Sequence, residues 1–350
     1  MIGGIIGYGA YIPRYRISVQ ELACARGDNA ARIADSLGLS EKSLPGPDED
    51  ALTMAVAASK NALTRADILA SVLQAVYVGS ESHPYAVKPS ATIVGEVLGI
   101  GNHYLAADFE FACKGGTAAL QAALGVVKSG MASCALAVGS DTAQAKPGDI
   151  LEYAAGAGAA AFIVSQDLTN ACAVVERTLS YSSDTPDFWR RSLAAYPEHE
   201  GRFTAQPAYF AHVVAATHAL LAEHNLQPTD VDHVVFHQPN GKFPLMAARQ
   251  LGFSHEQLSS GLLVETLGNS YSANSLLGLT AVLDSAKPNQ TIVLVSYGSG
   301  SGCDAFVIKT TEQLLAVQNK ARQTRAYLAE KKYVSYATYL QHLKTLHGDV

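Results

Sequence analysis

Short apolar segments alternate with longer Ala/Leu-rich segments over most of this 350-residue chain. The short segments end in glycine or a polar turn and cover residues 2–9, 75–79, 135–139, 159–164, 231–237, 291–297 and 305–309. The longer segments cover residues 49–66, 115–129, 207–224 and 275–286. Short apolar runs between turn signals predict buried strands, and the longer stretches predict helices that are buried on most sides. The alternation therefore predicts an α/β fold built from layers of sheet and helix.

The two halves of the chain resemble each other. One half contains LAVGSD (136–141) followed by GAGAAAFIVS (156–165), and the other contains VLVSYGSG (293–300) followed by CDAFVIKT (303–310). A predicted helix precedes each pair of segments. Two generic strand–helix–strand units would also give this pattern, but we favour a duplicated chain with halves 1–168 and 169–310. A duplicated fold can place a functional site where its halves meet.

The last segment, residues 311–350, differs in composition from the rest of the chain. It is richer in Lys, Gln and Tyr and predicts an exposed helix followed by a short tail. Such a C-terminal helical segment either caps the fold or offers a docking surface for a partner. Its composition does not distinguish these two roles.

Composition and charge exclude several classes of protein. Net charge is −6 and the sequence pI is about 6.0, which argues against general nucleic-acid binding. No apolar run approaches the roughly 20 residues of a membrane-spanning helix. The five cysteines are scattered and include no CxxC pair, which favours reduced thiols over disulfides or a structural zinc site. We therefore expect a soluble cytoplasmic protein whose apolar N-terminal stretch is a first strand rather than a signal peptide.

Cys113 combines a reactive residue type with a reactive position. A strand-like run at 104–112 ends at this cysteine, and a helix is expected to begin at about Lys114 or Gly115. The dipole and unpaired N–H groups of a helix N-terminus favour a thiolate, which can take an acyl group from a thioester. Gly115 and Gly116 are expected to leave room for a substrate beside the sulfur. A lone cysteine is more often a small core residue, and the other four cysteines are interpreted in that way.

Three further polar residues lie at predicted element boundaries. His237 follows an apolar strand and precedes a Pro-Asn-Gly turn, Asn269 precedes a helix, and Glu81 follows another apolar strand. Each also has a simpler interpretation, as a core histidine, a helix N-cap or an exposed loop acid. Together with Cys113 they would provide a nucleophile, two groups that polarise a carbonyl, and a carboxyl group whose raised pKa suits proton transfer.

Other candidate contacts are weaker. The glycine-lined loop around Gly298 and Ser299 could supply an oxyanion-binding N–H group, although it could also be a simple β-turn. Lys242 and Arg202 are candidate phosphate contacts or solvated surface charges. The sequence contains no GxxxxGK[ST] motif and no GxGxxG in a dinucleotide-binding context, so nucleotide-binding folds of those kinds are unsupported.

Several longer motifs resemble the hydroxymethylglutaryl-CoA synthase family of the archaeal type. The resemblance extends from the first predicted strand to EKKYVSYATYL in the C-terminal segment, and its motifs are GYGAYIPRYRI, VGSESHPYAVKPSATIVGE, FACKGGTAA, FHQPNGKFP, GNSYSANS and SYGSGSGCDAF. It implies a thiolase-like, duplicated αβαβα five-layer fold and a homodimer. It also implies condensation of acetyl-CoA with acetoacetyl-CoA and water, giving hydroxymethylglutaryl-CoA and CoA for the mevalonate pathway of isoprenoid synthesis.

The resemblance also implies roles for individual residues. Cys113 would carry the acetyl group, Glu81 would act as general acid and base, and His237 would position and protonate the acetoacetyl carbonyl. The substrate or CoA contacts that it implies are Arg202, Thr204, Lys242, Asn269 and Ser299. It implies no metal and no redox cofactor. Family members of this type also associate with an acetoacetyl-CoA thiolase and a small zinc-binding OB-fold protein, which the C-terminal segment could contact.

Three positions depart from the family pattern. Ala154 stands where threonine is expected, Met246 where arginine is expected, and Gly115 where alanine is expected. The first two substitutions remove a hydroxyl and a cation from positions associated with substrate, so they place the identity of the acyl acceptor in doubt.

Three other functions remain open at this stage. A decarboxylating enzyme of the ketoacyl-synthase-III type would share the Cys, His and Asn residues but would not need Glu81. An inactive scaffold of the same fold is a further alternative, although it need not retain the four polar residues. A biosynthetic thiolase fits less well because Ser296 stands where its second cysteine would be.

Overall fold

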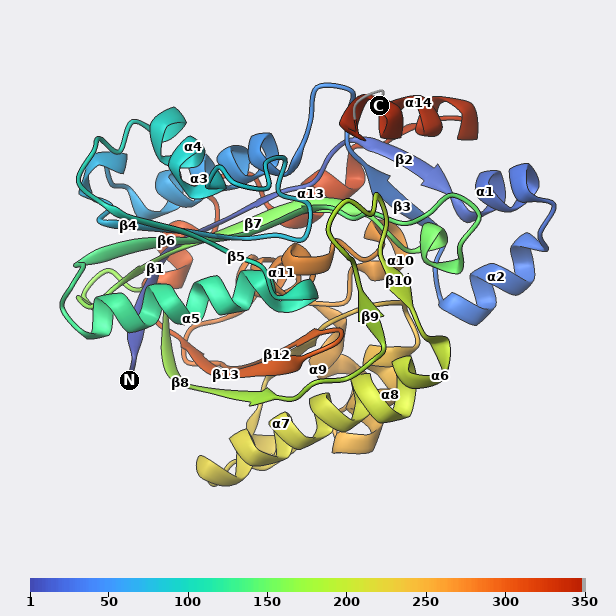
Figure 1. The fold of residues 1–350 in the computed structure, drawn as a ribbon. Coiled ribbons are helices and arrows are strands. Elements are labelled where there is room, and N and C mark those ends of the chain that lie inside the picture. Colours follow the sequence, from blue (N-terminus) through green and yellow to red (C-terminus); the bar gives the residue numbers. More distant parts are fainter. Residues whose placement is uncertain (348–350) are drawn as a thin grey trace.

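The computed structural model describes residues 1–347. Within this part of the chain, nine strands form one mixed sheet (Figure 1). The order across the sheet is β11–β12–β13–β8–β1–β7–β6–β4–β5. The bounds of these strands are β1 Gly3–Tyr11, β4 Ala75–Gly79, β5 Leu105–Phe109, β6 Cys134–Thr142, β7 Ala157–Ser165, β8 Ala173–Ser182, β11 His233–Phe236, β12 Thr291–Gly298 and β13 Gly302–Thr310.

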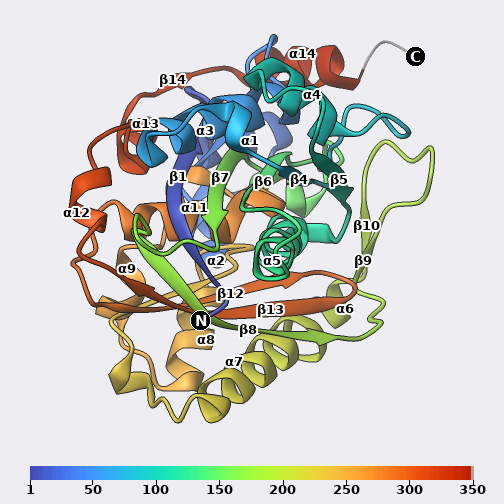
Figure 2. The same ribbon diagram turned by 90° about the vertical axis from the view of Figure 1, so that its left-hand side faces the viewer.

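Two small sheets flank the large one. A three-stranded sheet joins the N-terminal and C-terminal segments in the order β14–β2–β3, and a short hairpin consists of β9 and β10. Their bounds are β2 Tyr15–Ser18, β3 Glu41–Leu44, β9 Phe188–Trp189, β10 Glu198–His199 and β14 Lys332–Tyr333. The β9–β10 hairpin stands at the right-hand side of Figure 2, beside the main sheet.

Helices pack between and outside the two halves of the sheet. The longer ones are α3 Ala51–Ala66, α4 Ser90–Leu98, α5 Gly115–Lys128, α7 Ala211–Glu223, α8 Phe243–Leu251, α11 Asn274–Leu283 and α14 Tyr336–His347. The shorter ones are α1 Val19–Arg26, α2 Ala30–Leu37, α6 Gly201–Phe203, α9 His255–Ser259, α10 Val264–Leu267, α12 Leu314–Val317 and α13 Thr324–Ala329. No helix within residues 1–347 is both long enough and apolar enough to cross a bilayer.

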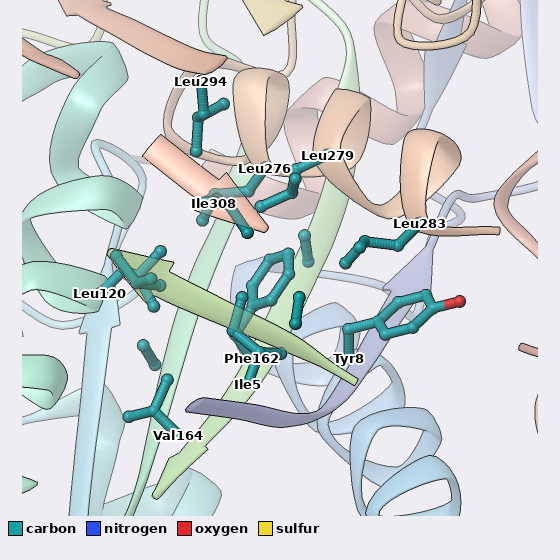
Figure 3. Packing of buried hydrophobic residues seen from close by; sticks show 14 of the residues in the cluster. Ile5, Tyr8, Leu120, Phe162, Val164, Leu276, Leu279, Leu283, Leu294 and Ile308 are labelled. Carbon is teal, nitrogen blue, oxygen red and sulfur yellow. The ribbon is translucent and has the colours of Figure 1, made fainter. Parts of the chain in front are cut away.

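The helices are layered on the apolar faces of the large sheet. α5 and α11 lie in the middle of the molecule, where α11 side chains gather with Phe162 of β7 and Ile308 of β13 (Figure 3). α3 covers the outer face of β1 and β7, and α7 covers the outer face of β8 and β13 (Figure 1). Helices therefore cover both outer faces of the sheet and fill the middle of the molecule. As a consequence, β6, β7 and β13 are buried over nearly their whole length. The prediction of a layered α/β fold is confirmed.

The strand order is symmetrical about the central pair of β1 and β8. Proceeding outwards, β7, β6 and β4 on one side correspond to β13, β12 and β11 on the other. Both central helices also begin after the same unusual turn, because Ala112 before α5 and Tyr271 before α11 each have φ of 44°. We propose that residues 1–168 and 169–310 are two copies of one unit. All strands on the β1 side of the sheet precede residue 169, and all strands on the β8 side follow it.

The C-terminal segment is more structured than one exposed helix. Residues 311–347 contain α12, α13, the short strand β14 and α14. Leu314 and Leu328 join the central core, and Tyr339 of α14 packs on the N-terminal segment. This part of the segment therefore closes the fold, and residues 348–350 of the predicted tail lie outside the described part.

Candidate active site

Cys113 lies in a short 3₁₀ turn, Ala112–Lys114, between β5 and α5. The turn reverses the chain sharply, and Ala112 adopts a left-handed backbone conformation that is costly for a residue with a Cβ. Lys114 holds the turn in place because its buried Nζ lies 3.0 Å from Asp304 Oδ1 in the other half of the chain. As the sequence predicts, Cys113 therefore directly precedes a helix N-terminus.

A cavity of about 60 Å³ lies beside Cys113. It is large enough for a few water molecules or a short acyl group, so a larger ligand would place only its reacting end here. Both halves of the chain and the β9–β10 hairpin contribute to its wall, which consists of Cys113, Leu151, Ala154, Ala155, Asp187, Phe188, His199, Thr204, Tyr209, His237, Pro239, Phe243, Asn269, Tyr271, Tyr297 and Ser299.

Glu81 follows β4, and its side chain lies close enough to the thiol of Cys113 for each group to affect the pKa of the other. Burial raises the pKa of the Glu81 carboxyl well above its usual range, and the nearby Asp141 carboxylate raises it further. A carboxylate with a raised pKa is a stronger base. Glu81 is thus suited to removing a proton from a group bound at Cys113.

Asp141 fixes the backbone that carries Glu81. Its carboxylate is fully buried at the end of β6 and accepts five hydrogen bonds of 2.6–3.0 Å, from Ser80, Glu81, Ser82 and Ser272. Four of these five bonds come from residues 80–82, so the loop after β4 is held in one conformation. The sequence motifs do not point to Asp141. Its position after an apolar strand is the same signal that singled out Glu81.

We expect Asp141→Asn to lower the free energy of unfolding by about 2–4 kcal/mol, because an amide would place its NH₂ group against donors that now point at the buried Asp141 carboxylate. Urea unfolding of the variant measures this. Asp184→Asn is the matched control, since Asp184 is exposed, and it should leave stability unchanged. A fully stable Asp141→Asn variant would contradict the role of Asp141 in holding the loop.

The position of Cys113 before the N-terminus of α5 does not by itself keep the thiol deprotonated. Burial raises the pKa of Cys113 well above its usual range, and the negative charge of Glu81 raises it further. The prediction that the helix N-terminus would favour a resting thiolate is therefore wrong for the structure without substrate. Desolvation outweighs the helix dipole here because Cys113 is only 3% exposed. Because two adjacent anions would repel each other, the Glu81–Cys113 pair keeps at least one proton.

Asn269 approaches Cys113 from the other half of the chain. Its Oδ1 atom accepts a hydrogen bond of 3.0 Å from the backbone N–H of Tyr271, which turns its NH₂ group the other way. That amide lies near Cys113 and lowers the pKa of the thiol, although less than burial raises it. Asn269 is therefore not a simple helix N-cap.

His237 is buried in the cavity wall at the end of β11. Burial lowers its pKa to about 3, so the imidazole is neutral near pH 7. Within the described residues, neither ring nitrogen has a hydrogen bond of good geometry, although the side chain of Asn274 lies near enough to raise the pKa slightly. Tyr209 fixes the backbone at this point by donating its hydroxyl to the carbonyl of His237 at 2.7 Å. A neutral imidazole in this position can donate a hydrogen bond to a carbonyl oxygen.

The structure separates the predicted substrate contacts into two groups. Thr204 and Ser299 border the cavity with Cys113. Arg202 and Lys242 do not; Arg202 is exposed and Lys242 lies 3.5 Å from Asp35 at the surface. These two cations could meet only a part of a ligand that extends beyond the cavity.

The two glycines after Cys113 serve protein packing. A Cβ atom at Gly116 would lie 2.4 Å from the carbonyl oxygen of Ser272, and a Cβ atom at Gly115 would lie 3.2 Å from the carbonyl oxygen of Phe109. The prediction that Gly115 and Gly116 leave room for a substrate is therefore wrong. They let β4, α5 and the turn before α11 approach closely, which brings the two halves together around the sulfur.

Several residues in the cavity wall carry no signal in the sequence analysis. Tyr297 donates its hydroxyl to Asp187 at 2.8 Å, and Tyr271 donates its hydroxyl to the carbonyl of Gln144 at 2.8 Å. These bonds tie the β9–β10 hairpin and the loop after β6 to the site. Ala154 also borders the cavity, whereas Met246 is 51% exposed on α8. Of the two departures from the family pattern that are associated with substrate, only Ala154 therefore borders the cavity in which the reacting end of a ligand would lie. Within residues 1–347 no group of three His, Cys, Asp or Glu side chains could hold a metal ion.

Comparison with known proteins decides the family. The chain is 54% identical over 345 residues to a hydroxymethylglutaryl-CoA synthase of Archaeoglobus fulgidus, covering 98% of this chain and 99% of the relative. It is 52% identical over 347 residues to a hydroxymethylglutaryl-CoA synthase of Methanocella arvoryzae, covering 99% of both chains. The chain belongs to the hydroxymethylglutaryl-CoA synthase family. The family that the sequence motifs indicate is thus confirmed.

Solved structures agree with this assignment to the hydroxymethylglutaryl-CoA synthase family. A structure of MvaS in complex with 3-hydroxy-3-methylglutaryl coenzyme A has a TM-score of 0.88 at 25% identity and covers 98% of this chain and 91% of that chain. A 3-oxoacyl-(acyl carrier protein) synthase III, FabH from Pseudomonas aeruginosa, has a TM-score of 0.81 at 22% identity, covering 88% of this chain and 98% of that chain, and shows the shared fold. Residues 221–310 also match the family model for the C-terminal part of 3-oxoacyl-[acyl-carrier-protein] synthase III. The predicted thiolase-like α/β fold is confirmed.

Proposed function

We propose that this chain condenses acetyl-CoA with acetoacetyl-CoA and water, giving hydroxymethylglutaryl-CoA and CoA, with Cys113 as the acyl-carrying nucleophile. One observation carries the proposal. The Cys113 thiol lies close to Glu81 from one half of the chain and to Asn269 from the other, near enough for both side chains to shift its pKa, and it shares a small cavity with His237. These are the groups that a thioester condensation needs, in a chain that belongs to a family of such synthases.

In the first step, the sulfur of Cys113 attacks the carbonyl carbon of acetyl-CoA. Glu81, which lies beside the thiol, accepts its proton, so the thiolate forms only when the thioester is in place. The C–S bond to CoA breaks, and the departing CoA sulfur takes up the proton. We expect Asn269 and the N–H groups near Ser299 to stabilise the oxygen as negative charge develops on it. The products of this step are acetyl-Cys113 and free CoA.

In the second step, Glu81 removes a proton from the acetyl methyl group. The resulting carbanion attacks the ketone carbon of acetoacetyl-CoA and forms the new carbon–carbon bond. We expect His237 to donate a hydrogen bond to the ketone oxygen as a neutral imidazole. Because burial lowers its pKa to about 3, His237 is a poor source of a full proton, and Glu81 can return the one it removed. This revises the expectation that His237 itself protonates the carbonyl. Water then cleaves the thioester to Cys113.

A labelling experiment tests the proposal. Incubation with radiolabelled acetyl-CoA, acid quenching and peptide mapping should place the label on the Cys113 peptide, and addition of acetoacetyl-CoA should convert it into hydroxymethylglutaryl-CoA. Absence of label from that peptide would support the inactive scaffold instead. Turnover with another β-ketoacyl-CoA but none with acetoacetyl-CoA would show that Ala154 accompanies a change of acyl acceptor.

A second candidate is a decarboxylating enzyme of the ketoacyl-synthase-III type, which the match over residues 221–310 favours. That part of the chain contains His237 and Asn269, which both reactions use, and it does not contain Glu81. The proximity of the Glu81 carboxyl to Cys113 favours the hydroxymethylglutaryl-CoA synthase reaction, because a decarboxylation supplies its own carbanion and needs no base at the acyl group.

We further propose that the protein is a cytoplasmic homodimer that uses no metal or redox cofactor. Arg202 and Lys242 are proposed to meet the distal part of CoA, and the C-terminal segment to meet an acetoacetyl-CoA thiolase and a zinc-binding OB-fold protein. Support for the dimer comes from β5, which is an edge strand of the large sheet (Figure 2). Its Leu105 is 41% exposed, and unpaired edge strands readily pair with a second chain.

We expect Leu105→Arg to convert the dimer into a monomer, because it places two like charges at the centre of the proposed contact. Size-exclusion chromatography with light scattering measures the mass. The control is Leu315→Arg, since Leu315 is 57% exposed on α12, on the opposite side of the molecule in Figure 2. Dimers of unchanged stability in the Leu105→Arg variant would place the interface elsewhere.

A further inference from the structure

A second histidine borders the reaction cavity. His199 is the last residue of β10, and its ring lies in the cavity wall together with Cys113. It comes from the β9–β10 hairpin, which Figures 1 and 2 show beside the main sheet. Neither the sequence motifs nor the proposed condensation steps assign it a role.

A carboxylate holds His199 in a defined orientation. Its Nε2 atom lies 3.1 Å from Asp149 Oδ1 and 3.2 Å from Asp149 Oδ2. Asp149 is itself fixed, because Oδ1 accepts the backbone N–H of Leu151 at 2.8 Å and its carbonyl accepts from Arg26 at 2.7 Å. Leu151 also borders the cavity, so the His–Asp pair bridges two parts of the cavity wall.

This contact determines which nitrogen carries the proton. A carboxylate only accepts hydrogen bonds, so Nε2 of His199 must be the protonated nitrogen that donates to Asp149. The Nδ1 atom of a neutral ring then has a free lone pair. Nδ1 forms no hydrogen bond to any side chain or backbone group of residues 1–347, so it is available to a water molecule in the cavity. Asp149 would stabilise the imidazolium that forms when Nδ1 accepts a proton.

We propose that His199, oriented by Asp149, is the general base that activates water for release of the product from Cys113. This inference rests on the proposed function. The water oxygen attacks the carbonyl carbon of the Cys113 thioester while Nδ1 takes one water proton. The carbon–sulfur bond then breaks, the sulfur leaves with its electron pair, and the proton on His199 passes to it. The step converts R–CO–S–Cys113 and H₂O into R–COOH and the free thiol.

The other polar groups are less suited to this step. His237 has its pKa lowered to about 3 by burial, so it cannot hold a proton taken from water near pH 7. Glu81 serves the proton transfers on the methyl group and the ketone oxygen. His199 is different because its side chain is 21% exposed at the cavity rim and paired with a carboxylate. The facing carboxylate would stabilise the positive charge that develops on the ring during the step.

The His199→Gln variant tests whether His199 is a general base or only a structural hydrogen-bond partner of Asp149. Gln can still donate a hydrogen bond to Asp149 from a position like that of Nε2, but it cannot accept a proton. In rapid-quench experiments with acetyl-CoA and acetoacetyl-CoA, Cys113 should still be acetylated and the carbon–carbon bond should still form. Release of the product should slow by about 10²–10⁴-fold. Intact-protein mass spectrometry should then show Cys113 carrying the whole condensation product with its CoA.

Two controls define the outcomes. His218→Gln, at an exposed position of α7, should release product at the wild-type rate, and Asp149→Asn should slow release because it no longer stabilises the imidazolium. A release rate for His199→Gln within twofold of wild type, or equal losses in acetylation and release, would overturn the proposal and leave His199 a structural contact. If the wild-type protein itself acquires no acetyl group on Cys113, the proposed function fails rather than this inference.

Discussion

Replacing Cys113 with serine should abolish formation of hydroxymethylglutaryl-CoA, with a fall in kcat of about 10⁴-fold or more, because loss of a catalytic nucleophile leaves only the binding and oxyanion contributions. A buried hydroxyl ionises far less readily than a thiol, and its oxygen is a weaker nucleophile toward thioesters. The cavity and its polar wall should remain, since serine is nearly the same size. Steady-state assay with acetyl-CoA and acetoacetyl-CoA gives the loss, and acid-quenched labelling shows whether any acyl group is still transferred.

The matched control is Cys134→Ser. Cys134 is also buried, at the start of β6, but does not border the cavity, so its replacement tests the general cost of placing a hydroxyl in the core. We expect that variant to lose some stability and keep its turnover per folded molecule. If Cys113→Ser retains more than one hundredth of the wild-type kcat, the covalent mechanism is wrong.

Glu81→Gln should slow condensation by about 10²–10⁴-fold, the usual contribution of a general base. The amide preserves the shape of the side chain and can still accept a hydrogen bond from Cys113, but it cannot remove a proton from the acetyl methyl group. Single-turnover measurement with preformed acetyl-enzyme isolates this step from acylation. Normal condensation by the variant would favour the decarboxylating alternative, which needs no base at this position.

The same substitution should stabilise the fold at neutral pH. Because burial and Asp141 raise the pKa of Glu81 above its ordinary value of 4.5, the folded protein binds this proton more tightly than the unfolded chain does. The contribution of Glu81 to stability is therefore full below pH 4.5 and is lost as pH rises through the folded-state pKa. Glutamine removes this loss, so we expect a gain of about 0.5–2 kcal/mol at pH 7.

Urea unfolding at several pH values tests the sign. The difference between Glu81→Gln and wild type should be near zero at pH 4 and should grow toward pH 8. A difference that shrinks with rising pH would mean that the Glu81 carboxylate is stabilised in the fold, and its assignment as a strong base would then fail. Together, lost activity and gained stability would identify Glu81 as a group kept for function.

The local sequence was sufficient to single out Cys113, the proposed nucleophile. An apolar run followed by Cys113 and a helix with two leading glycines is a contiguous pattern, so it predicts the strand, the turn and the start of α5 without knowledge of the rest of the chain. The same holds for His237 after β11. In contrast, β8 and α4 were not predicted, because their exposed faces interrupt the apolar pattern.

The chain's own sequence therefore determined the layered fold and the family and singled out Cys113 as the proposed nucleophile, since each depends on patterns within short contiguous segments. Only the tertiary structure decided the state of that nucleophile, because the pKa of Cys113 depends on how deeply it is buried and on a carboxyl group from another loop. It also decided that Asp141 holds Glu81 and that Asp149 orients His199. Such pairings join segments far apart in the chain, and no local pattern specifies which of them meet when the two halves pack together.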